Sequence, residues 1–272
     1  MLEIKLEEAV KIESIEDIIK DSLIQYGDRY EKPKSLVTVL QGVNELNYLN
    51  YSGLSAVFGK QKSRKTFYLC TVMSAACNNE VIDNKLRGYA KDKINLWFDT
   101  EQSKYYVNMI PYRIVKKLNL NRQPENLQIY SIKKYSTDDR IRIINHFMET
   151  VGNLGLVIID GIRDLVHDFN SLSECTDLIN KLMYWVDTNG CHIMIVLHIN
   201  PLRNGDEEKP RGHLGTELQN KIESSVLIEK DKEDKNISVI KPRDFRDKEI
   251  DKFGLGVDKI GVPYLFEIKE NF

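Results

Sequence analysis

Residues 54–77 read LSAVFGKQKSRKTFYLCTVMSAAC, and this stretch decides the fold. The short apolar run LSAVF (54–58) predicts a strand that is covered on both faces. A basic loop follows at 59–65, and residues 67–77 have the apolar content of a buried helix. Strand, loop and helix in this order form the setting in which proteins bind phosphate groups.

The loop matches the phosphate-loop pattern GxxxxGK[ST] at Gly59, Lys65 and Thr66. In that pattern backbone amides cradle the phosphates, the lysine neutralises the β and γ oxygens, and the hydroxyl binds magnesium. Arg64 stands where the pattern has its second glycine. The alternative is a solvated basic turn, because four of the seven residues 59–65 are cationic. The candidate phosphate-binding residues are Gly59, Lys60, Gln61, Lys62, Ser63, Arg64, Lys65 and Thr66.

The composition of the 272 residues is that of a globular protein, with 42% apolar and 29% charged residues. A net charge of −2 excludes a globally basic nucleic-acid coat but leaves room for a local basic groove. The four cysteines form no CxxC pair, which predicts reduced core thiols. We expect a cytoplasmic protein with no membrane contact, because the start of the chain has no run long enough for a signal peptide or a membrane span.

Four further apolar runs predict strands that are covered on both faces. They are INLWF (94–98), LQIY (127–130), LVIID (156–160) and IMIVL (193–197). Helical stretches lie between them, and capping-box spacing marks two helix starts, at Ser136 and Ser171. This alternation predicts an α/β fold, a parallel sheet with helices on both faces.

The two ends of the chain depart from this pattern. Residues 3–26 carry apolar positions at helical spacing, so we predict a short N-terminal helical appendage over 1–34 and one domain over 35–272. The tail runs SSVLIEKD, NISVIKPRDFR and VPYLFEIK predict an antiparallel extension of the sheet. Within the domain, Pro111 must kink or split the helix expected over 103–117.

Two carboxylates follow buried strands. Asp160 ends the run LVIID, and Glu101 follows INLWF within the tetrapeptide DTEQ. Ligands bind at the carboxyl ends of parallel strands, so Asp160 and Thr66 are candidate magnesium ligands. Glu101 is a candidate base that polarises a water molecule aimed at the γ-phosphate. The alternatives are an aspartate that merely opens a turn before Gly161 and ordinary loop acids.

His198 follows the run IMIVL, where a neutral polar side chain could sense the γ-phosphate by hydrogen bonding. The alternative is a histidine that is only a hydrogen-bonded structural group. The next loop, PLRNGDEEKPRGHLG, is long and contains glycine, and its basic residues include Arg203, Lys209 and Arg211. Loops of this length tend to be functional or mobile.

Together these stretches resemble the RecA-type ATPase core, and specifically the hexameric RepA-like and DnaB-like helicase branch. The similarity rests on GKQKSRKT, LWFDTEQS, LVIIDG, VLHINP with RGHLGTELQNK after it, and IKPR near the end. It spans about residues 50–245, and the order and spacing of five motifs are more specific than any one of them. The sequence departs from the pattern at Arg64 and has no obvious primase, zinc-binding or large DNA-binding domain.

The resemblance implies a role for each of five residues. Lys65 and Thr66 would hold the phosphates and magnesium. Glu101 would be the catalytic base, Asp160 the magnesium-side carboxylate and His198 the sensor at the end of its strand.

The resemblance also implies contacts beyond one subunit. The loop at 201–213 would face single-stranded DNA, with Arg203, Lys209 and Arg211 as its basic residues. Lys241 and Arg243, in a KxR arrangement, would reach into the nucleotide site of the neighbouring subunit. For Arg243 the alternative is a surface salt bridge.

We therefore expect a magnesium-dependent, helicase-like ATPase that binds ATP and Mg²⁺. It would assemble as a homo-oligomeric ring or filament and engage single-stranded DNA in replication or mobilisation of DNA. The alternative is a degenerate nucleotide-binding scaffold or regulatory protein, in which Arg64 abolishes turnover. A kinase on a phosphate-loop fold ranks below both, because Glu101 suits the activation of water better.

Overall fold

The computed structural model describes residues 14–199 and 212–268. The chain divides into two compact units, residues 1–32 and residues 33–272. In the described part of the chain, no helix has the length and apolar content that crossing a membrane requires.

The first unit contains the helix α1 (Ile15–Ser22), which is the predicted helical appendage. Ser14 caps its start: the Ser14 hydroxyl accepts a hydrogen bond from the Asp17 amide, and the Asp17 carboxylate accepts one from the Ser14 amide. The remainder of the helical prediction, over residues 3–13, lies outside the described residues.

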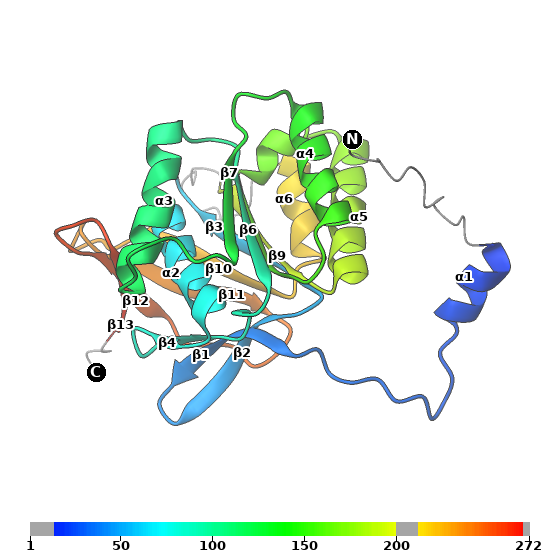
Figure 1. Cartoon of the computed structure of the whole chain (residues 1–272), viewed down its shortest axis with the longest axis horizontal. Helices are drawn as coiled ribbons and strands as arrows, with labels where there is room; N and C mark the ends of the chain where they lie inside the picture. Colours follow the sequence, from blue (N-terminus) through cyan, green and yellow to red (C-terminus); the bar gives the residue numbers. More distant parts are fainter. Residues whose placement is uncertain (1–13, 200–211, 269–272) are drawn as a thin grey trace, which may run out of the picture. The chain divides into compact units, whose positions relative to one another are not determined.

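The second unit is built on a nine-stranded sheet with the strand order β13-β12-β11-β10-β3-β9-β8-β6-β7 (Figure 1). The six strands from β10 to β7 are parallel to one another, and β11, β12 and β13 extend the sheet in antiparallel fashion. The strand bounds are β3 (Gly53–Gly59), β6 (Ile94–Asp99), β7 (Leu127–Ser131), β8 (Leu154–Asp160), β9 (His192–His198), β10 (Ser224–Lys230), β11 (Ser238–Phe245), β12 (Phe253–Val257) and β13 (Pro263–Glu267). The predicted parallel sheet with an antiparallel extension is confirmed.

Helices cover both faces of this sheet, as predicted (Figure 1). One face carries α2 (Lys65–Asn78) and α3 (Lys104–Lys117). The other carries α4 (Thr137–Thr150), α5 (Leu172–Asn189) and α6 (Gly212–Gln219), with a 3₁₀ turn at Ile162–Leu165.

Each central strand supplies side chains to both cores, which is why the strands read as continuous apolar runs. On β8, Leu156 and Ile158 belong to the core under α2, whereas Val157 and Ile159 belong to the core under α5. The four cysteines are free and buried, at positions 70, 77, 175 and 191.

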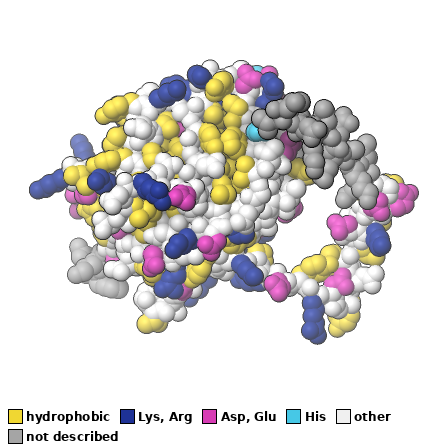
Figure 2. Space-filling model, viewed as in Figure 1, with side chains coloured by type: hydrophobic (Ala, Val, Ile, Leu, Met, Phe, Trp, Pro, Cys, Tyr) yellow, Lys and Arg dark blue, Asp and Glu magenta, His cyan; other side chains and the backbone are white. Residues whose placement is uncertain are grey.

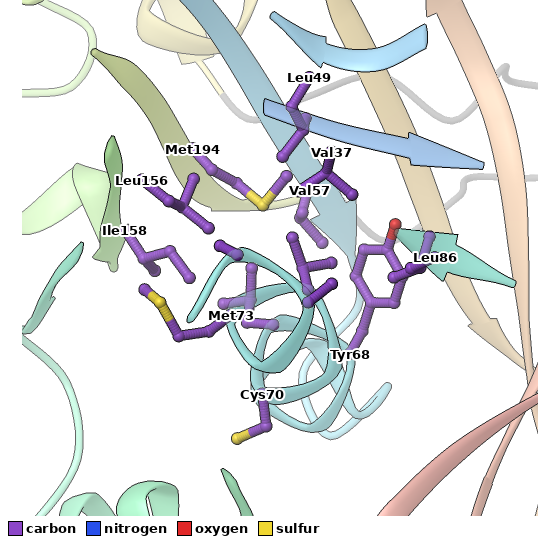
Figure 3. Close-up of a cluster of buried hydrophobic side chains, with 14 of the residues drawn as sticks. Val37, Leu49, Val57, Tyr68, Cys70, Met73, Leu86, Leu156, Ile158 and Met194 are labelled. Carbon is purple, nitrogen blue, oxygen red and sulfur yellow. The ribbon is translucent and has the colours of Figure 1, made fainter. Parts of the chain in front are cut away.

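A second, four-stranded sheet covers the outer side of α2, with the strand order β2-β1-β5-β4. Its strands are β1 (Ser35–Gln41), β2 (Asn44–Asn50), β4 (Val81–Ile82) and β5 (Leu86–Gly88). Figure 3 shows Tyr68 and Met73 of α2 among side chains from both sheets, including Val37 of β1, Leu86 of β5 and Ile158 of β8. The sequence pattern predicts only a connector after Pro33, so this sheet is a feature that the structure adds.

Two details differ from the sequence-based expectation. Pro111 lies inside α3, which the structure shows as one continuous helix over 104–117 and not as two helices. The run that begins at Ser224 forms β10, which is antiparallel only to β11. Toward β3 it is parallel, so it closes the parallel part of the sheet before the antiparallel extension begins.

His192 joins β9 to the second sheet through two buried hydrogen bonds. Its Nδ1 lies 2.7 Å from the carbonyl oxygen of Asn50, and its Nε2 lies 2.7 Å from the Ser55 hydroxyl. Since a carbonyl only accepts, Nδ1 carries the hydrogen and Nε2 accepts from the hydroxyl, which satisfies a neutral ring. Burial lowers the pKa of His192 from 6.5 to about 4.

We expect the free energy of unfolding to fall as the pH drops below about 6.5, because the unfolded chain then binds a proton at His192 that the folded chain does not bind until about pH 4. Between about pH 7.5 and pH 5 this group should remove about 2 kcal/mol. Urea denaturation at the two pH values, with His192→Gln beside the wild type, measures this contribution. An identical pH dependence in the two proteins would contradict it.

Candidate nucleotide-binding site

Four neighbouring parallel strands, β3, β9, β8 and β6, end at one edge of the sheet. In the register of the sheet, Gly59 at the end of β3 lies beside His198 at the end of β9. Asp160 at the end of β8 lies beside Asp99 at the end of β6. The polar residues that follow the apolar runs are therefore brought together, although they are far apart in the sequence.

The phosphate loop begins where the chain has room only for glycine. A Cβ atom at Gly59 would lie 2.6 Å from the carbonyl oxygen of Ile228 on β10 and 2.6 Å from the Ser63 hydroxyl. The Ser63 Oγ is buried and has no hydrogen-bond partner among the described residues. The loop thus folds tightly against the end of β3 and leaves one hydroxyl available inside it.

Lys65, the first residue of α2, is held inside the loop. Its Nζ donates to the carbonyl oxygens of Gly59 at 3.0 Å and Lys60 at 2.8 Å, and lies 3.1 Å from His198 Nδ1. Burial lowers the pKa of Lys65 from 10.5 to about 8, and the negative charge of Asp160 opposes that shift. The ammonium group is therefore placed at the centre of the edge and is bonded only to groups that a phosphate oxygen could replace.

Arg64 adopts a left-handed backbone, with φ 73° and ψ 28°, immediately before α2. A residue with a Cβ atom in this conformation costs about 1 kcal/mol or more, which explains why the pattern has glycine there. The Arg64 side chain leaves the loop and donates hydrogen bonds to Lys235, Ile237 and Ser238. The substitution thus keeps the backbone shape that a glycine would give.

Thr66 and Asp160 lie together, as predicted for a magnesium site: Thr66 Oγ1 donates to Asp160 Oδ2 at 3.0 Å. The amide of Gln102 donates to Asp99 Oδ2 at 2.8 Å and lies 3.5 Å from Asp160 Oδ2. Burial, together with the charge of Asp99, raises the pKa of Asp160 from 3.8 to about 7. A nearby cation would favour the ionised form.

The donor set of Thr66 and Asp160 fits Mg²⁺, which takes oxygen ligands, commonly one or two from protein together with phosphates and water. In the part of the chain that the structure describes, no group of three or more His, Cys, Asp or Glu side chains is arranged to hold a metal ion. A magnesium ion here would therefore depend on a nucleotide for its remaining ligands.

Glu101 is fixed by its neighbours on both sides. The Asp99 carboxylate accepts hydrogen bonds from the Glu101 amide at 3.1 Å and the Gln102 amide at 2.7 Å, which turns the chain at the end of β6. Glu101 Oε2 lies 3.4 Å from His198 Nε2. This hydrogen bond is the main cause that lowers the pKa of Glu101, so the carboxylate is ionised at neutral pH.

These side chains surround one cavity of about 370 Å³. It is lined by Lys62, Ser63, Arg64, Lys65, Thr66, Phe67, Glu101, Gln102, Tyr106, Arg113, Asp160 and His198. Four of these, Phe67, Gln102, Tyr106 and Arg113, are not predicted from the sequence. The Arg113 guanidinium lies 4.1 Å from the centre of the Phe67 ring. Only Gln102, within the quoted DTEQ, follows a strand closely enough to be found from the pattern.

The structure does not bring Lys241 and Arg243 to this cavity within the described chain. Lys241 pairs with Glu229 on the neighbouring strand. The Arg243 guanidinium lies 5.5 Å from the centre of the Phe58 ring, and its Nε lies 3.9 Å from Asp244 Oδ2. The basic residues predicted to face DNA, Arg203, Lys209 and Arg211, lie outside the described residues.

No protein-family model matches the chain, and a search of curated proteins finds no match. Two solved structures are similar to it. The crystal structure of the RadB recombinase has 14% sequence identity and a TM-score of 0.54, with 82% of this chain and 94% of that chain covered. The ATPase domain of a helicase has 12% identity and a TM-score of 0.58, with 82% of this chain and 86% of that chain covered. The fold is the RecA-like α/β fold.

Gly59→Ala tests the tight start of the phosphate loop. The added methyl group meets the fixed carbonyl of Ile228, so we expect the free energy of unfolding to fall by about 1 to 3 kcal/mol and the loop to be displaced. Urea denaturation measures the loss. Gly152→Ala is the matched control, because an added Cβ there has nothing within 4 Å. Equal stability of the two variants would contradict the packing argument.

Proposed function

We propose that the protein is a magnesium-dependent ATPase of the RecA-like phosphate-loop class. The observation that carries the proposal is the convergence of Lys65, Glu101, Asp160 and His198, from the ends of four parallel strands or the loops after them, on one cavity. A cation for phosphate, a carboxylate for a metal and an ionised carboxylate for water are the groups that phosphoryl transfer to water requires.

In the proposed reaction, Lys65 holds the phosphate oxygens, and the loop amides before it position them. Thr66 and Asp160 would hold Mg²⁺, which supplies neutralising charge to the phosphates when bound. Glu101 accepts a proton from a water molecule whose oxygen bonds to the γ-phosphorus. The bond from that phosphorus to the β–γ bridging oxygen breaks, and ADP keeps the electron pair.

His198 connects the two halves of this machinery. Its Nδ1 lies 3.1 Å from Lys65 Nζ, and its Nε2 lies 3.4 Å from Glu101 Oε2. One imidazole ring therefore touches both the phosphate-binding cation and the proposed base. This position supports the role of a sensor that registers the γ-phosphate through hydrogen bonding.

We further propose that the protein belongs to the RepA-like and DnaB-like helicase branch, assembles as a homo-oligomeric ring or filament and acts on single-stranded DNA. The order of the motifs along the chain supports this assignment. On the face shown in Figure 2, the described Lys and Arg side chains are interspersed with Asp and Glu. DNA binding would therefore depend on a local group of basic residues, and the loop at 201–211 supplies one.

Lys65→Ala and Glu101→Gln separate binding from turnover. The first should abolish most ATP binding, because it removes the cation at the centre of the loop. The second should keep binding and lose hydrolysis, because an amide preserves the shape of Glu101 but does not accept a proton. Equilibrium ATP binding and steady-state phosphate release measure the two properties. Glu80→Gln, an exposed glutamate after α2, is the control and should match the wild type.

Hydrolysis by Glu101→Gln at the wild-type rate would show that Glu101 is not the base. Tight ATP binding by the wild type with no turnover would instead favour the alternative, a nucleotide-binding scaffold or regulatory protein. The two outcomes are distinct because the first concerns the variant and the second concerns the natural chain.

Replacing the three basic loop residues by alanine tests the DNA contact. We expect weaker binding of single-stranded DNA and a salt dependence shallower by about 2 in log–log slope, because each lost phosphate contact releases fewer counterions. Fluorescence anisotropy over a salt series measures both. The replaced residues are Arg203, Lys209 and Arg211. The control replaces three exposed lysines, Lys232, Lys248 and Lys259. Unchanged binding and slope would remove this loop from the proposal.

Arg243→Ala tests whether one subunit completes the site of the next. A guanidinium supplied in trans stabilises the charge of the transferring phosphoryl group and is worth about 10³ to 10⁵ in rate. We expect specific ATPase activity to rise with protein concentration, and Arg243→Ala to lose turnover while keeping nucleotide affinity within a few fold. Mixed Glu101→Gln and Arg243→Ala subunits should partly restore activity. Near-normal turnover in Arg243→Ala would leave it as a residue that only packs on Phe58.

A further inference from the structure

The phosphate loop is tied to a turn that lies about 170 residues later in the sequence. The turn, residues 231–237, connects β10 to β11. Arg64 Nη2 donates to the Lys235 carbonyl at 2.7 Å, and Arg64 Nη1 lies 3.2 Å from the Ile237 carbonyl and 2.9 Å from the Ser238 hydroxyl. The Ser238 hydroxyl in turn donates to the Ser63 carbonyl at 3.2 Å. We call these four hydrogen bonds the Arg64 clamp.

The 231–237 turn is itself well organised, so it can hold the arginine in one place. The Asp231 carboxylate accepts hydrogen bonds from the amides of Glu233 and Asp234, both at 2.9 Å. The Asp234 carboxylate accepts one from the Asn236 amide at 2.8 Å. The Ile237 carbonyl, which receives Arg64, also accepts from the Asp231 amide at 3.0 Å.

The sheet brings the turn and the loop to the same edge. β10 is parallel to β3, and Ile228 lies beside Gly59 in the register. Both strands therefore run toward the edge at which the phosphate loop begins. β11 leaves the turn and carries Lys241 and Arg243, the residues that the proposed function places at the neighbouring subunit.

We propose that Arg64 is a positioning residue that holds the phosphate loop in its left-handed shape and couples nucleotide occupancy to the 231–237 turn. The inference rests on the proposed nucleotide-binding function. Phosphate draws on the amides of the loop that contains Arg64, and any adjustment of that backbone moves the guanidinium that the turn holds. The coupling is reciprocal, so loosening the turn weakens nucleotide binding.

Two substitutions of Arg64 separate the shape of the backbone from the clamp. Arg64→Gly removes the clamp but accepts the left-handed conformation, so Mg·ADP affinity should stay within about tenfold of the wild type. Arg64→Ala removes the clamp and retains the strain, so its affinity should be about tenfold weaker than that of Arg64→Gly. Fluorescence titration with Mg·ADP measures both.

Hydrogen–deuterium exchange of the peptide that covers residues 231–238 measures the coupling. In the wild type, Mg·ADP should slow exchange in this peptide. In Arg64→Gly at saturating Mg·ADP the slowing should be lost, and in Ser238→Ala, which breaks two of the four bonds, it should be reduced. Lys235→Ala is the matched control, because it removes a charge from the same turn and keeps the carbonyl that Arg64 uses; it should match the wild type.

Slowing of equal size in Arg64→Gly and in the wild type would overturn the inference, as would a wild type that binds Mg·ADP with no change in the turn. If Arg64→Gly does not fold, Ser238→Ala decides the question in the same way. A wild type that does not bind Mg·ADP would overturn the proposed function itself, and the coupling with it.

Discussion

Two buried carboxylates, those of Asp99 and Asp160, lie side by side at the ends of adjacent parallel strands, and the site is organised around them. The rise in the pKa of Asp160 to about 7 corresponds to about 4 kcal/mol against its charged form. Such a pair persists only where neighbouring donors compensate it. The Thr66 hydroxyl, the Gln102 side-chain amide and the backbone amides after Asp99 supply those donors.

This requirement fixes the rest of the edge. Because Asp99 is occupied by the amides that follow it, the chain turns there and Glu101 projects toward His198. Because Thr66 serves Asp160, the first turn of α2 must lie against β8. A cation that bound between Thr66 and Asp160 would therefore relieve an electrostatic cost that the folded chain already carries, which is the physical reason to expect affinity for one.

The centre of the fold could be predicted from the sequence, and its periphery could not. A strand buried on both faces needs a continuous apolar run, so LVIID ends visibly at Asp160 and predicts both a strand and a site residue. The second sheet was not predicted because the two-residue turn between β1 and β2, Gly42 and Val43, lacks the paired turn residues that mark a hairpin in a sequence. The roles of Lys65, Glu101 and Asp160 stay predictions, although the structure brings their side chains together.

The strand β3 is the middle strand of the nine, and the helix that leaves the phosphate loop is buried over 11 of its 14 residues. Elements this deep open only in the rare excursions that approach global unfolding. The phosphate loop is therefore suspended between the two slowest-opening parts of the molecule. Exchange of a bound nucleotide then cannot rely on breathing of the scaffold, and its rate is set by the loop and by whatever covers the cavity from outside.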